Sequence, residues 1–265
     1  MMVDGRAIAK RILNQVASET DALSFTPKLG VMTCAPGVET KQYLDLKKRK
    51  AKEVGIDLIV LELPEEASTE DCVACVNRLV EDCHGVLVQL PLPSHIDREV
   101  VLDAVPVAKD PDGFAYDRDS RSLLPPVAGA IDEISSEHGV SFEGKKVVIV
   151  GDGRLVGQPS FRYAEKAGGE VVLLTEGSDE YHDHIKSADI LISGVGKPHF
   201  ITDDMVKGGV VVFDAGASED GGLVVGDVGP SVADKASLFT PVPGGIGPIT
   251  VAVLLQNLSK LAANS

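Results

Sequence analysis

The chain has 265 residues, of which 44% are hydrophobic and 25% charged, the composition of an ordinary soluble globular protein. Its formal net charge of −15 argues against a nucleic-acid partner, which clustered basic residues would bind, and it gives no sign of a membrane surface. The length allows one large or two modest domains. No apolar signal segment opens the chain and no apolar run approaches membrane-spanning length, so we expect a cytoplasmic protein.

Four cysteines, Cys34, Cys72, Cys75 and Cys83, raise the question of a metal site. Cys72 and Cys75 form a C-x-x-C pair, but an apolar stripe at helical spacing runs through them, and no histidine pair lies at zinc-finger distance. We therefore expect no metal, and instead buried free thiols in a reducing compartment.

The first half of the chain alternates predicted helices and strands. Hydrophobic periodicity and turn residues predict a helix through residues 8–16, a strand at 29–34, a helix from about residue 39 that ends at Gly55, and a strand at 56–63. A capping box of Ser68 and Asp71 then begins a helix that ends near Gly85, and a further helix is predicted at 98–105. This alternation is typical of an α/β domain.

After a helix near residues 126–138, which we expect to join two domains, the same pattern starts again. It predicts strands at residues 146–150, 171–174, 190–193 and 210–213, and the last of these leaves residues 214–217 at the edge of the sheet. A second series of βαβ units predicts a second domain.

The stretch Val86–Pro93, Val-Leu-Val-Gln-Leu-Pro-Leu-Pro, reads as a strand buried on both faces that two prolines end. We expect it in the middle of a sheet, where it would bring Gln89 to the carboxyl-end edge at which ligands bind in open α/β sheets. The alternative is a core strand whose single amide is merely hydrogen-bonded.

A glycine-rich turn, Gly151-Asp-Gly-Arg-Leu-Val-Gly157, follows the strand at residues 146–150 and opens a helix. Such a turn lets backbone N–H groups approach a pyrophosphate, and Glu176 falls about where a ribose-binding acid is expected. The alternative is a set of glycines that serves a tight turn alone. The candidate cofactor-binding residues are Gly151, Asp152, Gly153, Arg154, Gly157, Glu176 and, at the edge after a later strand, Ala217.

Tyr43 and Lys47 lie four residues apart and so share one face of the predicted second helix. Lysines and an arginine surround them, so a solvated basic face is the alternative.

Five motifs in order resemble the bifunctional methylenetetrahydrofolate dehydrogenase/methenyltetrahydrofolate cyclohydrolase family. They are Tyr43-x-x-x-Lys47 with Gly55-Ile56, Val88-Gln-Leu-Pro-Leu-Pro93, Lys109-Asp-Pro-Asp-Gly-Phe114, Gly226-Asp-Val228 and Thr240-Pro-Val-Pro-Gly-Gly-Ile-Gly-Pro-Ile-Thr250. The resemblance implies a folate-binding catalytic α/β domain (residues 1–125), a Rossmann-type cofactor domain (126–244), a last helix (245–265) that returns to the first domain, a folate site between the domains, and a homodimer.

Carried over by motif, Lys47 matches the family's catalytic lysine, Gln89 its hydrogen-bonding partner, Tyr43 the aromatic residue that packs on folate, and Asp112 the carboxylate that anchors the pterin. Pro243, Gly244 and Gly245 would also contact the substrate. A lysine partly desolvated in a cleft has a lowered pKa and exchanges protons near neutrality, as water attack on a methenyl carbon requires.

Three departures from the family pattern bear on cofactor and activity. Asp152 replaces the arginine of the usual Gly-Arg-Ser, Glu176 replaces a serine, and Leu124–Gly129 replaces a Pro-Cys-Thr-Pro segment. Two acids would repel the 2′-phosphate of NADP, and Arg154 is the nearby basic residue that could compensate, so we expect NAD to be preferred.

The resulting hypothesis is an enzyme that oxidises methylenetetrahydrofolate with a nicotinamide cofactor and hydrolyses the methenyl product to formyltetrahydrofolate. One alternative is a dehydrogenase whose altered segment has cost it the cyclohydrolase activity. Another is a catalytically silent protein that binds folate or a dinucleotide.

Overall fold

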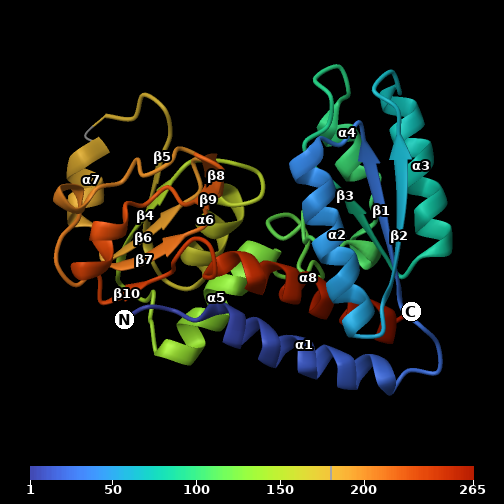
Figure 1. The fold of residues 1–265 in the computed structure, drawn as a ribbon, viewed down its shortest axis with the longest axis horizontal. Coiled ribbons are helices and arrows are strands. Elements are labelled where there is room, and N and C mark those ends of the chain that lie inside the picture. Colours follow the sequence, from blue (N-terminus) through green and yellow to red (C-terminus); the bar gives the residue numbers. More distant parts are fainter. Residues whose placement is uncertain (180) are drawn as a thin grey trace. The chain divides into compact units, whose positions relative to one another are not determined.

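The structure is a computed structural model that describes residues 1–179 and 181–265, and the side chains of these residues apart from that of residue 39. The chain forms two compact units (Figure 1). The three-stranded unit comprises Lys10–Pro125 and Val251–Ser265, and the five-stranded unit comprises Met1–Ala9 and Pro126–Thr250. Both are built on parallel sheets, so the predicted α/β class is confirmed.

The three-stranded unit has the strand order β2-β1-β3, with all pairs parallel. Parallel neighbours need crossover connections, and helices supply them. The elements are β1 (Lys28–Cys34), α2 (Val38–Glu53), β2 (Asp57–Leu63), α3 (Thr69–Asp82), β3 (Gly85–Val88), α4 (Arg98–Asp103) and the short 3-10 helix η1 (Val107–Lys109). The capping box of Ser68 and Asp71 opens α3 as predicted.

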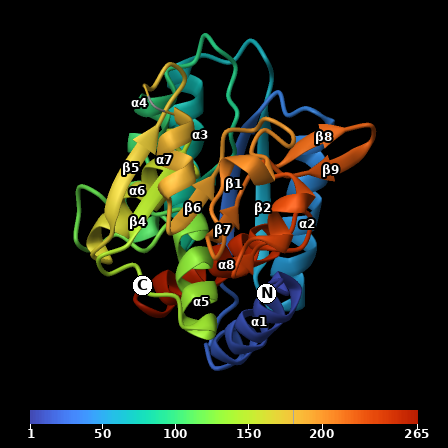
Figure 2. The same cartoon turned by 90° about the vertical axis from the view of Figure 1, so that its left-hand side faces the viewer.

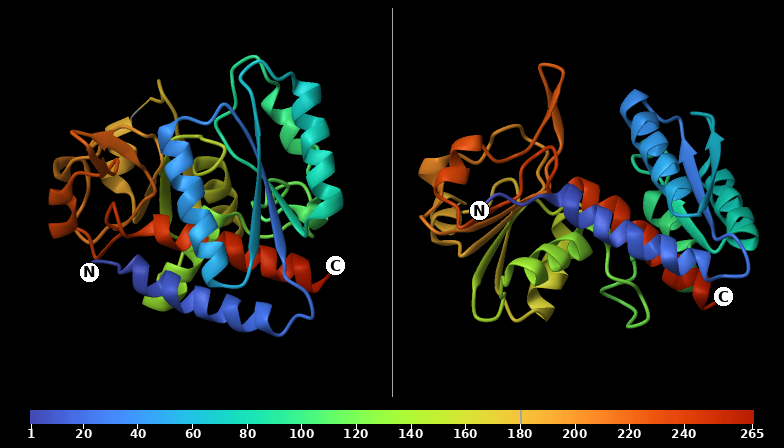
Figure 3. Two further views of the ribbon diagram at one scale, coloured as in Figure 1. Left: turned by 45° about the vertical axis from the view of Figure 1, so that its right-hand side comes forward. Right: turned by 60° about the horizontal axis from the view of Figure 1, so that its bottom comes forward.

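The two faces of this sheet carry different helices, α2 on one and α3 on the other (Figure 3). Val86 and Val88 of β3 join Met32 of β1 in a buried apolar cluster with residues of α3 and α4. Because side chains alternate along a strand, Leu87 and Gln89 face the opposite side, toward α2. The β3 register therefore aims Gln89 at the helix that carries Lys47.

The prediction that the Val86–Pro93 strand lies in mid-sheet is wrong. The strand ends at Val88, and β3 is an edge strand of the three-stranded sheet. It is nevertheless buried, because other segments cover the edge: a Cβ added at Gly85 would lie 2.6 Å from a methyl group of Leu258 and 3.5 Å from Pro111. Because these segments cover it, the edge strand needs the same continuous run of apolar residues that a central strand would need.

Helices α1 (Gly5–Asp21) and α8 (Ile246–Ala263) belong in part to each unit. From Val251 onward α8 is part of the three-stranded unit, where Ser259 Oγ donates a hydrogen bond to Glu19 Oε2 of α1 at 3.0 Å, so the predicted return of the last helix is confirmed. Contrary to our expectation, α8 is long and apolar enough to cross a membrane. The core helix of a soluble protein meets the same criterion, and 61% of this helix is buried inside the protein.

The five-stranded unit has the order β10-β7-β6-β4-β5, again with all pairs parallel (Figure 2). Its strands are β4 (Lys146–Val150), β5 (Glu170–Leu174), β6 (Ile190–Ser193), β7 (Val211–Asp214) and β10 (Leu238–Phe239), and its helices are α5 (Pro126–His138), α6 (Gly157–Lys166), α7 (Tyr181–Ser187), η2 (Asp203–Met205) and η3 (Pro230–Asp234). A hairpin of β8 (Ser218–Asp220) and β9 (Leu223–Val225) extends from it. The predicted strands of this half are confirmed.

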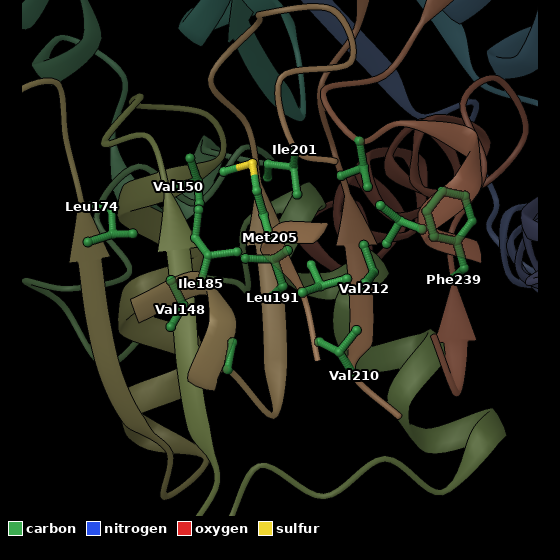
Figure 4. Packing of buried hydrophobic residues seen from close by; sticks show 14 residues of the cluster. Val148, Val150, Leu174, Ile185, Leu191, Ile201, Met205, Val210, Val212 and Phe239 are labelled. Carbon is green, nitrogen blue, oxygen red and sulfur yellow. The ribbon is translucent and has the colours of Figure 1, made fainter. Parts of the chain in front are cut away.

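Apolar side chains fill both faces of the five-stranded sheet. On one face Val148 and Val150 of β4 pack in a buried cluster with Ile185 of α7 and Met205 of η2 (Figure 4). On the other face Phe142 stacks on Phe213 with ring centroids 6.3 Å apart and meets Tyr163 of α6 edge-on at 5.3 Å. The tightly held sheet fixes the positions of the loops at its carboxyl-end edge.

The units divide the chain after residues 9, 125 and 250, whereas the expected domains were 1–125 with 245–265, and 126–244. The first nine residues group with the five-stranded unit because they extend its sheet edge. Val3 N donates to Phe239 O at 2.9 Å, and Phe239 N donates to Met1 O at 2.8 Å.

Candidate active site

Lys47 lies on the apolar face of α2, between Leu44 and Ala51. These three residues and Val54 are spaced by three or four positions and are all at most 6% exposed, whereas Lys48 is exposed. The helix therefore carries Lys47 into the interior, while its other basic residues are exposed or partly exposed. The alternative of a wholly solvated basic face does not apply to Lys47.

The Lys47 ammonium meets Gln89 inside the three-stranded unit. Lys47 Nζ donates to Gln89 Oε1 at 2.9 Å, and Gln89 Nε2 donates to the carbonyl of Leu90 at 2.8 Å, which fixes the orientation of the amide. Tyr43, one turn earlier on α2, places its ring centroid 4.6 Å from Lys47 Nζ. Burial lowers the pKa of Lys47, and the charge of Asp112 only partly opposes this effect.

Asp112 lies in a loop that a second aspartate shapes. The buried Asp110 carboxylate accepts hydrogen bonds from the backbone N–H groups of Asp112, Gly113 and Phe114 at 3.0, 2.9 and 2.7 Å. Burial raises the pKa of Asp112 to about 7, against the attraction of Lys47 and with a smaller contribution from the Asp110 charge. The loop thus holds an acid that titrates near neutrality close to a lysine with a lowered pKa.

A residue of the C-terminal helix locks this loop in place. The buried Asn257 side chain donates both amide hydrogens, to Pro111 O and to Leu124 O, each at 2.9 Å. A Cβ on Gly113 would lie 2.3 Å from Leu123 O, so only glycine allows this approach. The altered Leu124–Gly129 segment therefore begins by packing against the Asp112 loop, and its last four residues start α5.

In the five-stranded unit, the glycine turn is shaped by close backbone packing. Gly151 has φ of +97°, and a Cβ on Gly157 would lie 1.9 Å from Gly151 O. The first residue of α6 thus contacts the turn at a distance that no side chain permits. Backbone N–H groups at a helix start in such a turn suit a pyrophosphate, so the residues present fit a bound dinucleotide.

The acids singled out from the sequence lie at the same edge of the sheet as this turn. Asp152 is exposed in the turn itself, Arg154 follows it, and Ala217 is exposed after β7. The Glu176 side chain, after β5, is 93% exposed and has Lys197 Nζ 3.4 Å from its Oε1. The sequence suggests Arg154 as the compensating cation, whereas the basic residue in contact with Glu176 is Lys197, which follows β6.

Two buried aspartates organise the loops of this edge. Asp227 accepts hydrogen bonds from Ser193 Oγ and from the backbone N–H groups of Val195 and Lys197 at 2.8, 2.7 and 2.9 Å. Asp214 accepts backbone N–H groups of Gly216, Asp227 and Val228, and burial raises its pKa to about 6. The loops after β6, β7 and β9 are thereby tied to one another.

The other candidate substrate residues, Pro243, Gly244 and Gly245, belong to the five-stranded unit and immediately precede α8. Gly244 has φ of +111°, and a Cβ on Gly245 would lie 2.7 Å from Pro241 O, so both positions need glycine.

Among the described residues, no group of three or more histidine, cysteine or acidic side chains is arranged to hold a metal ion. Cys34, Cys72 and Cys83 are buried free thiols, and burial raises the pKa of each.

Sequence reasoning missed the residues that support the site. Asp110 and Asp227 lie inside the Lys109–Phe114 and Gly226–Val228 motifs, but a sequence does not show which carboxylate points into the protein. Asn257 and Lys197 carry no local signal at all. Lys47 did have one, since it interrupts an apolar stripe at helical spacing.

Comparisons with known proteins match both parts of the chain to one family. Residues 3–112 match the family described as tetrahydrofolate dehydrogenase/cyclohydrolase, catalytic domain, and residues 125–265 match its NAD(P)-binding domain. A bifunctional protein FolD of Nautilia profundicola is 38% identical over 277 residues, which cover 99% of this chain and 97% of the relative.

Solved structures also resemble the whole chain. The bifunctional methylenetetrahydrofolate dehydrogenase/cyclohydrolase FolD of Campylobacter jejuni has a TM-score of 0.94 at 31% identity and covers 100% of this chain and 99% of its own. The Trypanosoma brucei enzyme, complexed with NADP and an inhibitor, has a TM-score of 0.92 at 30% identity, with the same coverage. The chain therefore belongs to the tetrahydrofolate dehydrogenase/cyclohydrolase family and is an enzyme with a catalytic domain and an NAD(P)-binding domain.

Proposed function

We propose that this chain oxidises methylenetetrahydrofolate to methenyltetrahydrofolate with a nicotinamide dinucleotide and hydrolyses the methenyl product to formyltetrahydrofolate. The observation that carries the proposal is the buried Lys47–Gln89 hydrogen bond with Asp112 nearby. A buried ammonium is costly unless function or pairing retains it, and here one neutral amide is its hydrogen-bond partner. A silent binding protein would have no need of this arrangement.

Lys47 is proposed to handle protons in the hydrolytic step. Water adds to the electrophilic methenyl carbon, loses a proton, and the ring C–N bond then breaks to leave the formyl group. Because burial lowers its pKa, the Lys47 amine releases its proton more readily than an exposed lysine does, so it can take up and return the proton of the water while Gln89 holds it in position.

Folate binding is proposed to use Asp112, Tyr43 and the Pro243–Gly245 segment. A carboxyl group whose pKa is about 7 can exchange a proton with the pterin ring and hydrogen-bond to it in either form. The half-exposed Tyr43 ring offers a flat apolar surface for stacking.

The dinucleotide is proposed to bind on the backbone of Gly151, Gly153 and Gly157, and when bound it would supply the hydride acceptor. The exposed acids Asp152 and Glu176 favour NAD over NADP, because each can repel a 2′-phosphate while Glu176 can accept a hydrogen bond from a ribose hydroxyl. Lys197 reduces this preference, since it neutralises part of the Glu176 charge.

Absorbance assays test the function. The purified chain should reduce NAD, and less efficiently NADP, in the presence of methylenetetrahydrofolate, and should separately hydrolyse methenyltetrahydrofolate. If the chain oxidises methylenetetrahydrofolate but does not hydrolyse methenyltetrahydrofolate, it is a dehydrogenase without cyclohydrolase activity. If it does neither, it is a binding protein.

The proposed effect of Asp152 and Glu176 on the preference for NAD can be tested separately. The double variant with Glu176→Ser and Asp152→Arg should raise kcat/KM with NADP relative to NAD. A native enzyme that prefers NADP, or a double variant whose ratio does not move toward NADP, would show that these acids do not set the preference.

We also propose that the protein is a cytoplasmic homodimer. The family resemblance supports the dimer, and the buried free thiols fit a reducing compartment. The mass of the native chain in solution, measured by light scattering, tests the dimer.

A further inference from the structure

Lys197 and Glu176 form an ion pair across the cofactor edge of the five-stranded sheet. Lys197 follows β6 and Glu176 follows β5, and β4 lies between these two strands. The contact of 3.4 Å between Lys197 Nζ and Glu176 Oε1 therefore spans the end of β4, where the glycine turn begins. The ion pair and the glycine turn therefore share the carboxyl-end edge of the sheet.

The two ends of the Lys197 side chain differ in how firmly they are held. Its backbone N–H donates to the buried Asp227 carboxylate at 2.9 Å, as does that of Val195 at 2.7 Å, so the root of the side chain is fixed. The side chain itself is 53% exposed, and its ammonium lies 5.9 Å from the centroid of the Phe200 ring. The ammonium can change partner without any movement of the loop.

The backbone of Glu176 is also held in place, whereas its side chain is exposed. Thr175 N donates to Ser178 Oγ at 2.9 Å, Ser178 N donates to Thr175 O at 3.1 Å, and Gly177 has φ of +89°, so Glu176 occupies a tight turn. Its carboxylate is almost wholly exposed and meets Lys197 in solvent. Such a pair holds weakly, and a more highly charged partner can replace it.

We propose that Lys197 is a specificity-determining residue: it receives the 2′-phosphate of NADP, and Glu176 competes with that phosphate for its ammonium. The proposal rests on the proposed function, because it takes the glycine turn to hold the dinucleotide. With NAD, Glu176 accepts the ribose hydroxyl and Lys197 is dispensable. With NADP, the 2′-phosphate carries nearly two negative charges and attracts the Lys197 ammonium more strongly than the Glu176 carboxylate, which carries one. Lys197 bound to the phosphate then offsets the repulsion from Asp152 and Glu176.

The experiment is a cycle of four proteins: the native chain, Lys197→Met, Glu176→Gln, and the variant with both changes. For each, kcat/KM is measured with NAD and with NADP, and the affinity for each dinucleotide is measured by calorimetry. Lys197→Met should lower kcat/KM and affinity for NADP by about tenfold and change those for NAD by less than about twofold. Glu176→Gln should raise both quantities for NADP.

The double variant separates direct contact from an indirect role. If Lys197 binds the phosphate, the Lys197→Met change should still lower NADP affinity about tenfold when residue 176 is glutamine, because no competitor remains. If Lys197 merely neutralises Glu176, that change should have no effect in the glutamine background, and the proposal is overturned.

Lys207→Met is the matched control. Lys207 Nζ also pairs with a carboxylate, Asp189 Oδ1, at 2.6 Å, and its side chain is 39% exposed. Asp189 immediately precedes β6, so this pair lies at the opposite, amino-end edge of the sheet. This variant changes the net charge equally and should leave the ratio of NADP to NAD affinity unchanged.

The outcomes distinguish this proposal from the function on which it rests. A native chain that binds neither dinucleotide overturns both. A native chain that binds NAD but not NADP, or a Lys197→Met variant that is unchanged with NADP or equally weakened with both cofactors, overturns this proposal alone.

Discussion

The polar sites of the two units are built by opposite means. In the three-stranded unit the chemistry lies in side chains that the fold buries: Lys47 is 6% exposed, and its hydrogen-bond partner Gln89 is 8% exposed. In the five-stranded unit the site is backbone, shaped by glycines that let β4, the turn and α6 approach, with charged side chains left in solvent around it. The first site depends on desolvation and the second on shape, so substitutions should damage them differently.

The largest effect is expected from the buried lysine. Lys47→Met keeps much of the apolar stem and removes the amine, so methenyltetrahydrofolate hydrolysis should fall by about 10²-fold or more while folate binding persists. Lys48→Met, at the exposed neighbouring position, should leave the rate unchanged. An unaltered hydrolysis rate in the Lys47 variant would remove this residue from the mechanism.

The glycine turn of the five-stranded unit should lose its function when a side chain prevents the close approach of its backbone. Gly157→Ala places a methyl group 1.9 Å from Gly151 O, and such overpacking costs typically about 1–3 kcal/mol in the free energy of unfolding. Dinucleotide binding should be lost with it, while folate binding in the other unit persists. Gly208→Ala is the control, since no atom lies within 4 Å of the added carbon. Calorimetric unfolding and NAD titration measure both, and an unchanged NAD affinity would show that the close approach is not needed.

Removal of the acid in the three-stranded unit should have a smaller effect on folate. Asp112→Ala should weaken folate binding by about 1–3 kcal/mol, the usual cost of unpaired polar groups in a buried site. Titration of the variant with a folate substrate measures the change. Asp117→Ala, at an exposed position of the following segment, should not alter the affinity. Equal affinities of native chain and Asp112 variant would reduce Asp112 to a turn residue.

The smallest effect concerns pH. Because the folded pKa of Asp112 is about 7, the folded chain holds a proton there that the unfolded chain releases from about pH 4 upward. Stability from this group is therefore full below about pH 4 and is lost as the pH rises to about 7.

Asp112→Asn should flatten this decline by on the order of 1 kcal/mol, allowing for the partial exposure of the residue. Asp214, with a pKa of about 6, acts in the same direction in the five-stranded unit and should keep part of the slope. Urea unfolding without ligand at several pH values measures it, and identical slopes in native and variant chains would contradict the Asp112 shift.

The sequence by itself determined the alternation of helices and strands, the α/β class, the glycine turn and the family. These are local properties: apolar periodicity reports which face is buried, and glycine is favoured where φ is positive and needed where two backbone segments touch. The motif order was also enough to select Lys47, Gln89 and Asp112 as one group.

The tertiary structure alone decided where the polar groups turn and what covers them. It placed β3 at a sheet edge and buried it under residues near positions 111 and 258, which an apolar run cannot distinguish from a central strand. It brought Asn257 to Pro111 in the Asp112 loop across 146 positions of sequence and to Leu124 across 133, and it brought Lys197 to Glu176 across 21. Such contacts depend on the packing of whole elements, and no local pattern records them.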